Sequence, residues 1–140
     1  MKGYPAMIKE GLKEGITKSM EITVEDRMTA ASMSSGALEV FATPMMISYM
    51  ETVSFNCAQE QLEEGWSTVG VAVNITHDAP TPVGRKVRFD CKLENIDRRK
   101  LTFSVVATSD NGTVIGKGMH DRFIVEVDKF MNKMYNAYND

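Results

Sequence analysis

The stretch TPMMISYMETVSFNCAQEQLEEG, residues 43–65, holds the strongest helix signal in the chain. Thr43 suits the N-cap, because its hydroxyl can take up a free backbone N–H, and Pro44 suits the first helical position. Apolar side chains then keep to one helical face; they are Met46, Tyr49, Met50, Val53, Cys57 and Leu62. Gly65 offers a left-handed C-terminal cap. The sequence therefore predicts one long helix that ends near Gly65.

Around this helix the apolar residues recur with a period of two, which is typical of strands with one buried face. The alternation is clearest from Val87 to Leu93, and it repeats from Leu101 to Ala107. Asp110-Asn111-Gly112 predicts a tight hairpin, since these residues tolerate positive φ. We expect five strands, over residues 15–24, 68–76, 86–94, 101–107 and 113–127.

Two segments are less regular. Residues 25–39 show no firm period and indicate a loop with a short helical turn, and loops of this length inside a domain are often functional. Residues 129–138 favour a short terminal helix.

The order of these elements predicts the fold class. A single long helix ahead of a strand meander must bury its apolar face against that sheet, because neither has another partner. With no repeat or linker in 140 residues, we expect one domain, residues 1–140, of α+β class. This is the hotdog fold, a long central helix wrapped by an antiparallel β-sheet of about five strands. Such small sheets often pair edge to edge, so we expect a homodimer.

Composition narrows the classes of function. The net charge of −3 and the isoelectric point near 5.4 argue against nucleic acid as a partner. No apolar run approaches the roughly 20 residues of a membrane-spanning helix, and we see no signal peptide. Cys57 and Cys91 lie in apolar patterns without metal-ligand spacing, which indicates reduced core thiols. We therefore expect a cytoplasmic protein without a membrane partner, a metal or a cofactor.

Three side chains are candidates for chemistry. Thr43 lies at the predicted helix N-terminus, where free N–H groups and the helix dipole stabilise a developing oxyanion. Glu51, eight residues on, projects roughly to the same side and lies close to the apolar face. His77 ends a predicted strand, and an imidazole is the natural base for water or a hydroxyl.

Each candidate also has a plain structural interpretation. Thr43 can be a simple N-cap, Glu51 a solvated helix residue, and His77 a structural residue at a strand end. No Gly-x-Ser-x-Gly elbow, phosphate loop or zinc spacing competes with the three. Together they suit thioester hydrolysis, in which attack on the carbonyl places negative charge on its oxygen.

At these residues the sequence resembles one known family, the fluoroacetyl-CoA-specific thioesterases and their hotdog relatives. The segment VFATPMM (40–46), running on to Met50 and Glu51, is similar to that family's loop and helix start. The segment GVAVNITH (70–77) is similar to the strand that carries its histidine. Further similar segments are TPVG (81–84), RRKL (98–101), IGKGMHDR (115–122) and EVDKF (126–130). They occur in order and with nearly constant spacing, so together they indicate the family more specifically than any single segment does.

The resemblance implies that Thr43, Glu51 and His77 form the catalytic trio of an acyl-CoA thioesterase, with a small acyl-CoA as the bound partner. It also implies that Gly70 and Arg122 contact the substrate. A strand glycine lets a ligand approach the backbone, and an arginine can hold a carbonyl or a CoA phosphate. The alternatives are close packing at Gly70 and a surface position for Arg122.

The sequence departs from this family in one place. The fluoroacetyl specialists close a small pocket with aromatic residues before the threonine, whereas residues 28–38 here contain none. We therefore expect a small acyl group without carrying over the fluoroacetyl preference. A non-catalytic acyl-CoA-binding module on the same fold is the alternative function, and a hydroxyacyl-CoA dehydratase fits the layout less well.

Overall fold

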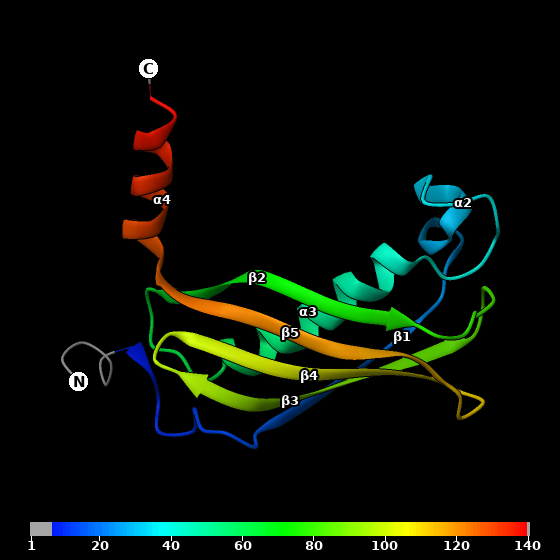
Figure 1. The fold of residues 1–140 in the computed structure, drawn as a ribbon, viewed down its shortest axis with the longest axis horizontal. Helices are drawn as coiled ribbons and strands as arrows, with labels where there is room; N and C mark the ends of the chain where they lie inside the picture. Colours follow the sequence, from blue (N-terminus) through cyan, green and yellow to red (C-terminus); the bar gives the residue numbers. More distant parts are fainter. Residues whose placement is uncertain (1–6, 140) are drawn as a thin grey trace.

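Helix α3 (Thr43–Gln59) lies along one face of a five-stranded antiparallel sheet in the computed structural model, which describes residues 7–139 (Figure 1). The strand order in the sheet is β1-β3-β4-β5-β2. The strands are β1 (Thr17–Thr23), β2 (Trp66–His77), β3 (Lys86–Asp97), β4 (Lys100–Ser109) and β5 (Val114–Glu126). The predicted α+β architecture, with a central helix on a sheet of five strands, is confirmed.

The apolar face of α3 packs against the sheet as predicted. Its buried residues recur every three or four positions, and they are Met46, Met50, Val53, Ser54, Cys57 and Ala58. The inward residues of β3 and β4 meet them from the sheet, and all are at most 3% exposed; they are Val87, Phe89, Cys91, Leu93, Leu101, Phe103, Val105 and Ala107. Burial of these side chains is the main stabilising term that joins the two layers.

Both predicted ends of α3 need correction. Ala42 is the N-cap, and its carbonyl accepts the N–H of Met46 at 3.0 Å. Thr43 is therefore the first helical residue, and its hydroxyl faces His77 instead of capping the helix. At the other end the helix stops at Gln59, with Glu60 as C-cap. Gly65 has a φ of +89° in the turn just before β2, so its left-handed conformation serves that turn.

The irregular segments contain short helices. Residues 25–39 hold the 3-10 helix η1 (Asp26–Met28) and the single turn α2 (Ala30–Met33), whose N-cap Thr29 accepts the N–H of Ser32 at 3.2 Å. The predicted terminal helix is α4 (Val127–Ala137), which projects away from the sheet (Figure 1). Of the helices in residues 7–139, none combines the length and hydropathy needed to cross a bilayer.

A bulge in β2 decides which side chains face the helix. Gly70 pairs with Arg122 and Ala72 with Asp121, so Val71 is an extra residue in this strand. Gly70 and His77 are seven positions apart, and a regular strand would place them on opposite faces. The extra residue shifts the alternation by one, so that both Gly70 and His77 face α3.

Candidate active site

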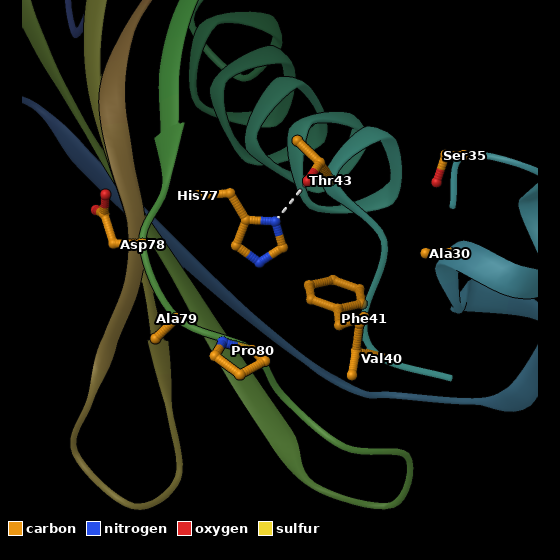
Figure 2. Close-up of a pocket in the computed structure, with 9 residues that line it drawn as sticks. All are labelled: Ala30, Ser35, Val40, Phe41, Thr43, His77, Asp78, Ala79 and Pro80. Carbon is orange, nitrogen blue, oxygen red and sulfur yellow. Dashed lines mark hydrogen bonds between the residues drawn. The ribbon is translucent and has the colours of Figure 1, made fainter. Parts of the chain in front are cut away.

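Thr43 and His77 meet where α3 begins and β2 ends. The Thr43 Oγ1 lies 2.6 Å from the His77 Nδ1. Figure 2 draws this contact as a dashed line. Thr43 is exposed and His77 is half-buried. Because a neutral imidazole can accept a proton at Nδ1, this contact pairs a hydroxyl with a base.

The second nitrogen of His77 is free for a further partner. Its Nε2 is buried and has no hydrogen-bond partner within residues 7–139. Burial lowers the pKa of His77 from its ordinary value of 6.5, and the nearby charge of Asp78 opposes that shift. The imidazole is therefore held neutral at pH 7, the form that acts as a base.

A cavity of about 280 Å³ opens beside this pair. Thr43 and His77 line it together with Phe41, and the segment after α2 contributes Ser35 to the far wall (Figure 2). Phe41 is 1% exposed, and its ring packs edge-on against Phe89 with centroids 6.4 Å apart. Residues 28–38 contain no aromatic residue, but Phe41 supplies an aromatic wall that the sequence analysis did not single out.

Glu51 belongs to a second polar cluster on the same face of the sheet. A Cβ atom added to Gly70 would lie 3.0 Å from Glu51 Oε2, 3.2 Å from His120 Cε1 and 3.3 Å from Arg122 Nη1. These distances are tighter than ordinary contact, so a larger residue would press on the ends of these side chains, in line with the alternative interpretation of Gly70 as a site of close packing. The absence of a side chain also opens the backbone to the space between these charged groups.

Arg122 is buried, so the interpretation as a surface cation is wrong. It is 7% exposed, and it donates from Nε to Thr68 Oγ1 at 2.7 Å and from Nη2 to the Thr68 carbonyl at 3.0 Å. Its guanidinium carbon lies 5.6 Å from the ring centroid of Phe55. Burial lowers the pKa of Arg122, and the charge of Glu51 opposes that shift. The charge of Glu51 therefore favours the charged form of this buried guanidinium.

The predicted trio is divided between these two clusters within one chain. Glu51 lies eight positions after Thr43 in the helix, a rise of about 12 Å. Thr43 and His77 are in direct contact, while Glu51 faces Gly70 and Arg122. His120 and Thr68 were not singled out by sequence; the spacing of His120 and Arg122, two apart on one strand face, is the signal that could have pointed to the first. In residues 7–139, no three His, Cys, Asp or Glu side chains group as metal ligands.

The fold and the hydroxyl–imidazole pair define a class of protein. A hot-dog-like protein from Thermanaerovibrio acidaminovorans superposes with a TM-score of 0.83 at 20% identity, covering 91% of this chain and 93% of the other. That likeness shows the fold alone. A mutant of the fluoroacetyl-CoA-specific thioesterase FlK, in complex with fluoroacetate and CoA, superposes with a TM-score of 0.79 at 30% identity over 85% of this chain and 99% of that one. The molecule is a hotdog-fold thioester hydrolase.

The family follows from the sequence comparisons. The profile of the fluoroacetyl-CoA-specific thioesterase family, FlK, matches residues 24–128. The fluoroacetyl-CoA thioesterase of Streptantibioticus cattleyicolor is 35% identical over 96 residues, which are 69% of this chain and 68% of that protein. The chain belongs to the fluoroacetyl-CoA-specific thioesterase family.

Proposed function

We propose that this protein hydrolyses a small acyl-CoA thioester to the free acid and CoA, with Thr43, Glu51 and His77 as its catalytic groups. The observation that carries the proposal is the 2.6 Å contact between Thr43 Oγ1 and His77 Nδ1 beside a cavity. A hydroxyl in hydrogen-bond reach of a base is the arrangement of an activated nucleophile.

The contact favours a route in two steps. Nδ1 of His77 takes the Thr43 proton while Oγ1 attacks the thioester carbonyl. Free N–H groups in the first turn of α3 stabilise the oxyanion, worth about 2.7–4 kcal/mol for one good donor. The C–S bond then breaks, and His77 gives its proton to the CoA thiolate, whose thiol has a pKa of about 8.5. Water, deprotonated by His77, then attacks the carbonyl of the Thr43 ester. The bond from the acyl carbon to Oγ1 breaks, the acid leaves, and His77 returns the proton to Oγ1 of Thr43.

A homodimer built on β2 would complete this site. β2 pairs with β5 on one side only, and its open edge exposes Val71 by 57% and Val73 by 47%. Unpaired edges of this kind are templates for a second strand. An antiparallel pairing centred near Val73 would bring Glu51 of the partner subunit toward His77. There its carboxylate would orient the imidazole and stabilise the imidazolium that forms.

The substrate follows from the cavity and from the relatives. In that dimer Gly70 and Arg122 lie beside the Glu51 that approaches His77, so they would contact the thioester end of the substrate, where the strand backbone is open and a buried cation lies close by. The relatives named above act on fluoroacetyl-CoA or bind fluoroacetate and CoA. A cavity of about 280 Å³ suits a short acyl group. Cys57 and Cys91 are free and buried, which supports a reducing, cytoplasmic setting.

A thiol-release screen over acetyl-, fluoroacetyl-, propionyl-, branched and aromatic acyl-CoAs tests the proposal. Glu51→Gln and His77→Ala should each lower kcat by about 10²- to 10⁴-fold on the best substrate. The unfolding midpoint should stay close to wild type in His77→Ala, whereas Glu51→Gln should lower it, because the charge of Glu51 favours the buried guanidinium of Arg122. Mass spectrometry of acid-quenched enzyme should find the acyl group on Thr43; an adduct on Glu51 would instead make that carboxylate the nucleophile. Wild-type rates in both variants would refute the trio.

The alternative is a non-catalytic acyl-CoA-binding module. Calorimetry would then show tight binding of acyl-CoA by the wild-type protein, while no thiol is released. The paired hydroxyl and imidazole favour hydrolysis, because a binding site has no need of a base held 2.6 Å from a hydroxyl.

A further inference from the structure

The buried imidazole of His120 spans the two sides of the β2 bulge. It is 1% exposed, and its Nδ1 lies 2.8 Å from the carbonyl oxygen of Ala72. Its Nε2 lies 3.1 Å from Nη1 of Arg122. Arg122 in turn holds the Thr68 carbonyl at 3.0 Å. Two side chains of β5 thus hold two carbonyls of β2, one before and one after the extra residue Val71.

These contacts fix the protonation state of His120. The Ala72 carbonyl can only accept a hydrogen bond and the Arg122 guanidinium can only donate one. Both contacts are satisfied together only when Nδ1 carries the proton and Nε2 is bare. Burial, which lowers the pKa of His120, keeps the ring neutral and allows this tautomer.

The hydrogen bond from His120 lies at the bulge that determines which face of the sheet the His77 side chain is on. The Ala72 carbonyl points to the helix side of the sheet to meet the imidazole, which is the local distortion expected at a bulge. Beyond it, Val73 pairs with His120 and His77 with Gly116, so the strand continues in the shifted alternation. Without that shift, His77 would face away from α3 and from Thr43.

We infer that His120, braced by Arg122, is a positioning residue for thioester hydrolysis: it holds the β2 bulge that turns His77 onto the face of Thr43. The effect on catalysis rests on the proposed function. The role of His120 in holding the β2 bulge does not depend on that function. His120 lies on β5, and among the described residues its hydrogen bonds go to Ala72 and Arg122, and not to Thr43 or His77. Its effect on the reaction passes through the strand.

Variants of His120 test this link. His120→Leu fills a similar volume but removes the Nδ1–H donor. His120→Asn keeps an N–H donor near the position of Nδ1. Leu93→Ala on β3, with β4 between it and β5, is the matched control for lost core packing. The chain has two histidines, so in either His120 variant the remaining imidazole resonance belongs to His77 and its NMR titration can be read directly.

We expect His120→Leu to lower kcat at least roughly tenfold, since misplacing a reacting group by 1 Å can cost about a hundredfold. The pKa of His77 should rise toward its ordinary value as the ring becomes more exposed. His120→Asn should restore both readouts, and Leu93→Ala should lower the unfolding midpoint but leave the His77 titration unchanged. A folded His120→Leu protein with wild-type kcat and an unmoved His77 titration would overturn the inference.

A measurement on the wild-type protein tests the inference even where a variant does not fold. Nitrogen-15 NMR of the imidazoles at neutral pH should show His120 protonated at Nδ1 and bare at Nε2; the opposite tautomer or an imidazolium would overturn it. If the wild type hydrolyses no acyl-CoA at all, the proposed function fails. The tautomer and the His77 titration then still decide whether His120 holds the bulge.

Discussion

The hydroxyl of Thr43 lies 2.6 Å from the imidazole of His77, although 34 positions separate the two residues in the chain. Thr43 is free to make this contact because Ala42, and not Thr43, caps α3. Because the Thr43 hydroxyl does not cap the helix, a substitution there can test catalysis without a large effect on stability.

Thr43→Ala should lower kcat by about 10²- to 10⁴-fold while changing the free energy of unfolding little, because the side chain makes no capping hydrogen bond. Thr43→Ser should keep most of the activity, since it retains the hydroxyl. Steady-state kinetics and urea unfolding measure the two effects. Thr52→Ala is the control, because the Thr52 hydroxyl donates to Ser48 of the same helix. Loss of stability without loss of activity in Thr43→Ala would contradict the assigned role.

The pH dependence of activity should follow the lowered pKa of His77. Burial disfavours the imidazolium, so the neutral base persists below the ordinary pKa of 6.5. We expect kcat/KM to stay level from pH 8 down past about 6.5 and to fall only in more acid solution. An activity that already declines above that ordinary value would mean that His77 is not held neutral by burial.

The same lowered pKa predicts how stability changes with pH. In the unfolded chain His77 has its ordinary pKa, so the unfolded state binds a proton first as the pH falls. The contribution of His77 to stability is therefore complete above the unfolded pKa and is lost as the pH falls through the folded pKa. Urea unfolding from pH 8 to pH 5 should show this loss, and His77→Gln should reduce the slope.

Gly70→Ala should weaken the site by crowding the second polar cluster. The added Cβ would lie 3.0 Å from Glu51 and 3.2 Å from His120, so these side chains must shift. We expect a loss of about 1–3 kcal/mol in the free energy of unfolding and a lower kcat/KM. Val69→Ala, one position earlier on the opposite face of β2, should leave kcat/KM unchanged. Wild-type kinetics in Gly70→Ala would show that this glycine has no part in binding or catalysis.

Val73→Lys should separate the proposed homodimer by placing a charge on the open edge of β2. Light scattering across a concentration series should then report a monomer, and kcat should fall because Glu51 of the partner subunit is no longer near His77. Val114→Lys is the matched control, since Val114 is 44% exposed at the start of β5, away from that edge. A monomeric wild-type protein with full activity would rule out a site shared between subunits.

The sequence predicted those parts of the fold in which each residue obeys a simple period. The alternation from Val87 to Leu93 and the helical face from Met46 to Cys57 both survive unchanged. The bulge at Val71 was beyond prediction, because GVAVNITH is compatible with an unbroken strand. It depends on contacts with His120 and Arg122, which are about fifty residues away in the chain.

The candidate site was predicted only where a local sequence signal exists. A threonine before a proline is typical of a helix start, and that placed Thr43 within one position of its true location. Its contact with His77 could be anticipated only from the resemblance to a family, since it requires the strand end to lie beside the helix start. The burial of Arg122 by Thr68 and Phe55 has no local signal at all.

Phe41 belongs both to the cavity wall and to the hydrophobic core, where its ring meets Phe89. A smaller residue at this position would enlarge the cavity and also remove core packing. A cavity enlarged at Phe41 would therefore accept a larger acyl group, but the protein would be less stable. The opposite wall at Ser35 is exposed and makes no such core contact. Mutations that broaden or narrow substrate choice should therefore accumulate on the Ser35 side during evolution, while Phe41 changes rarely.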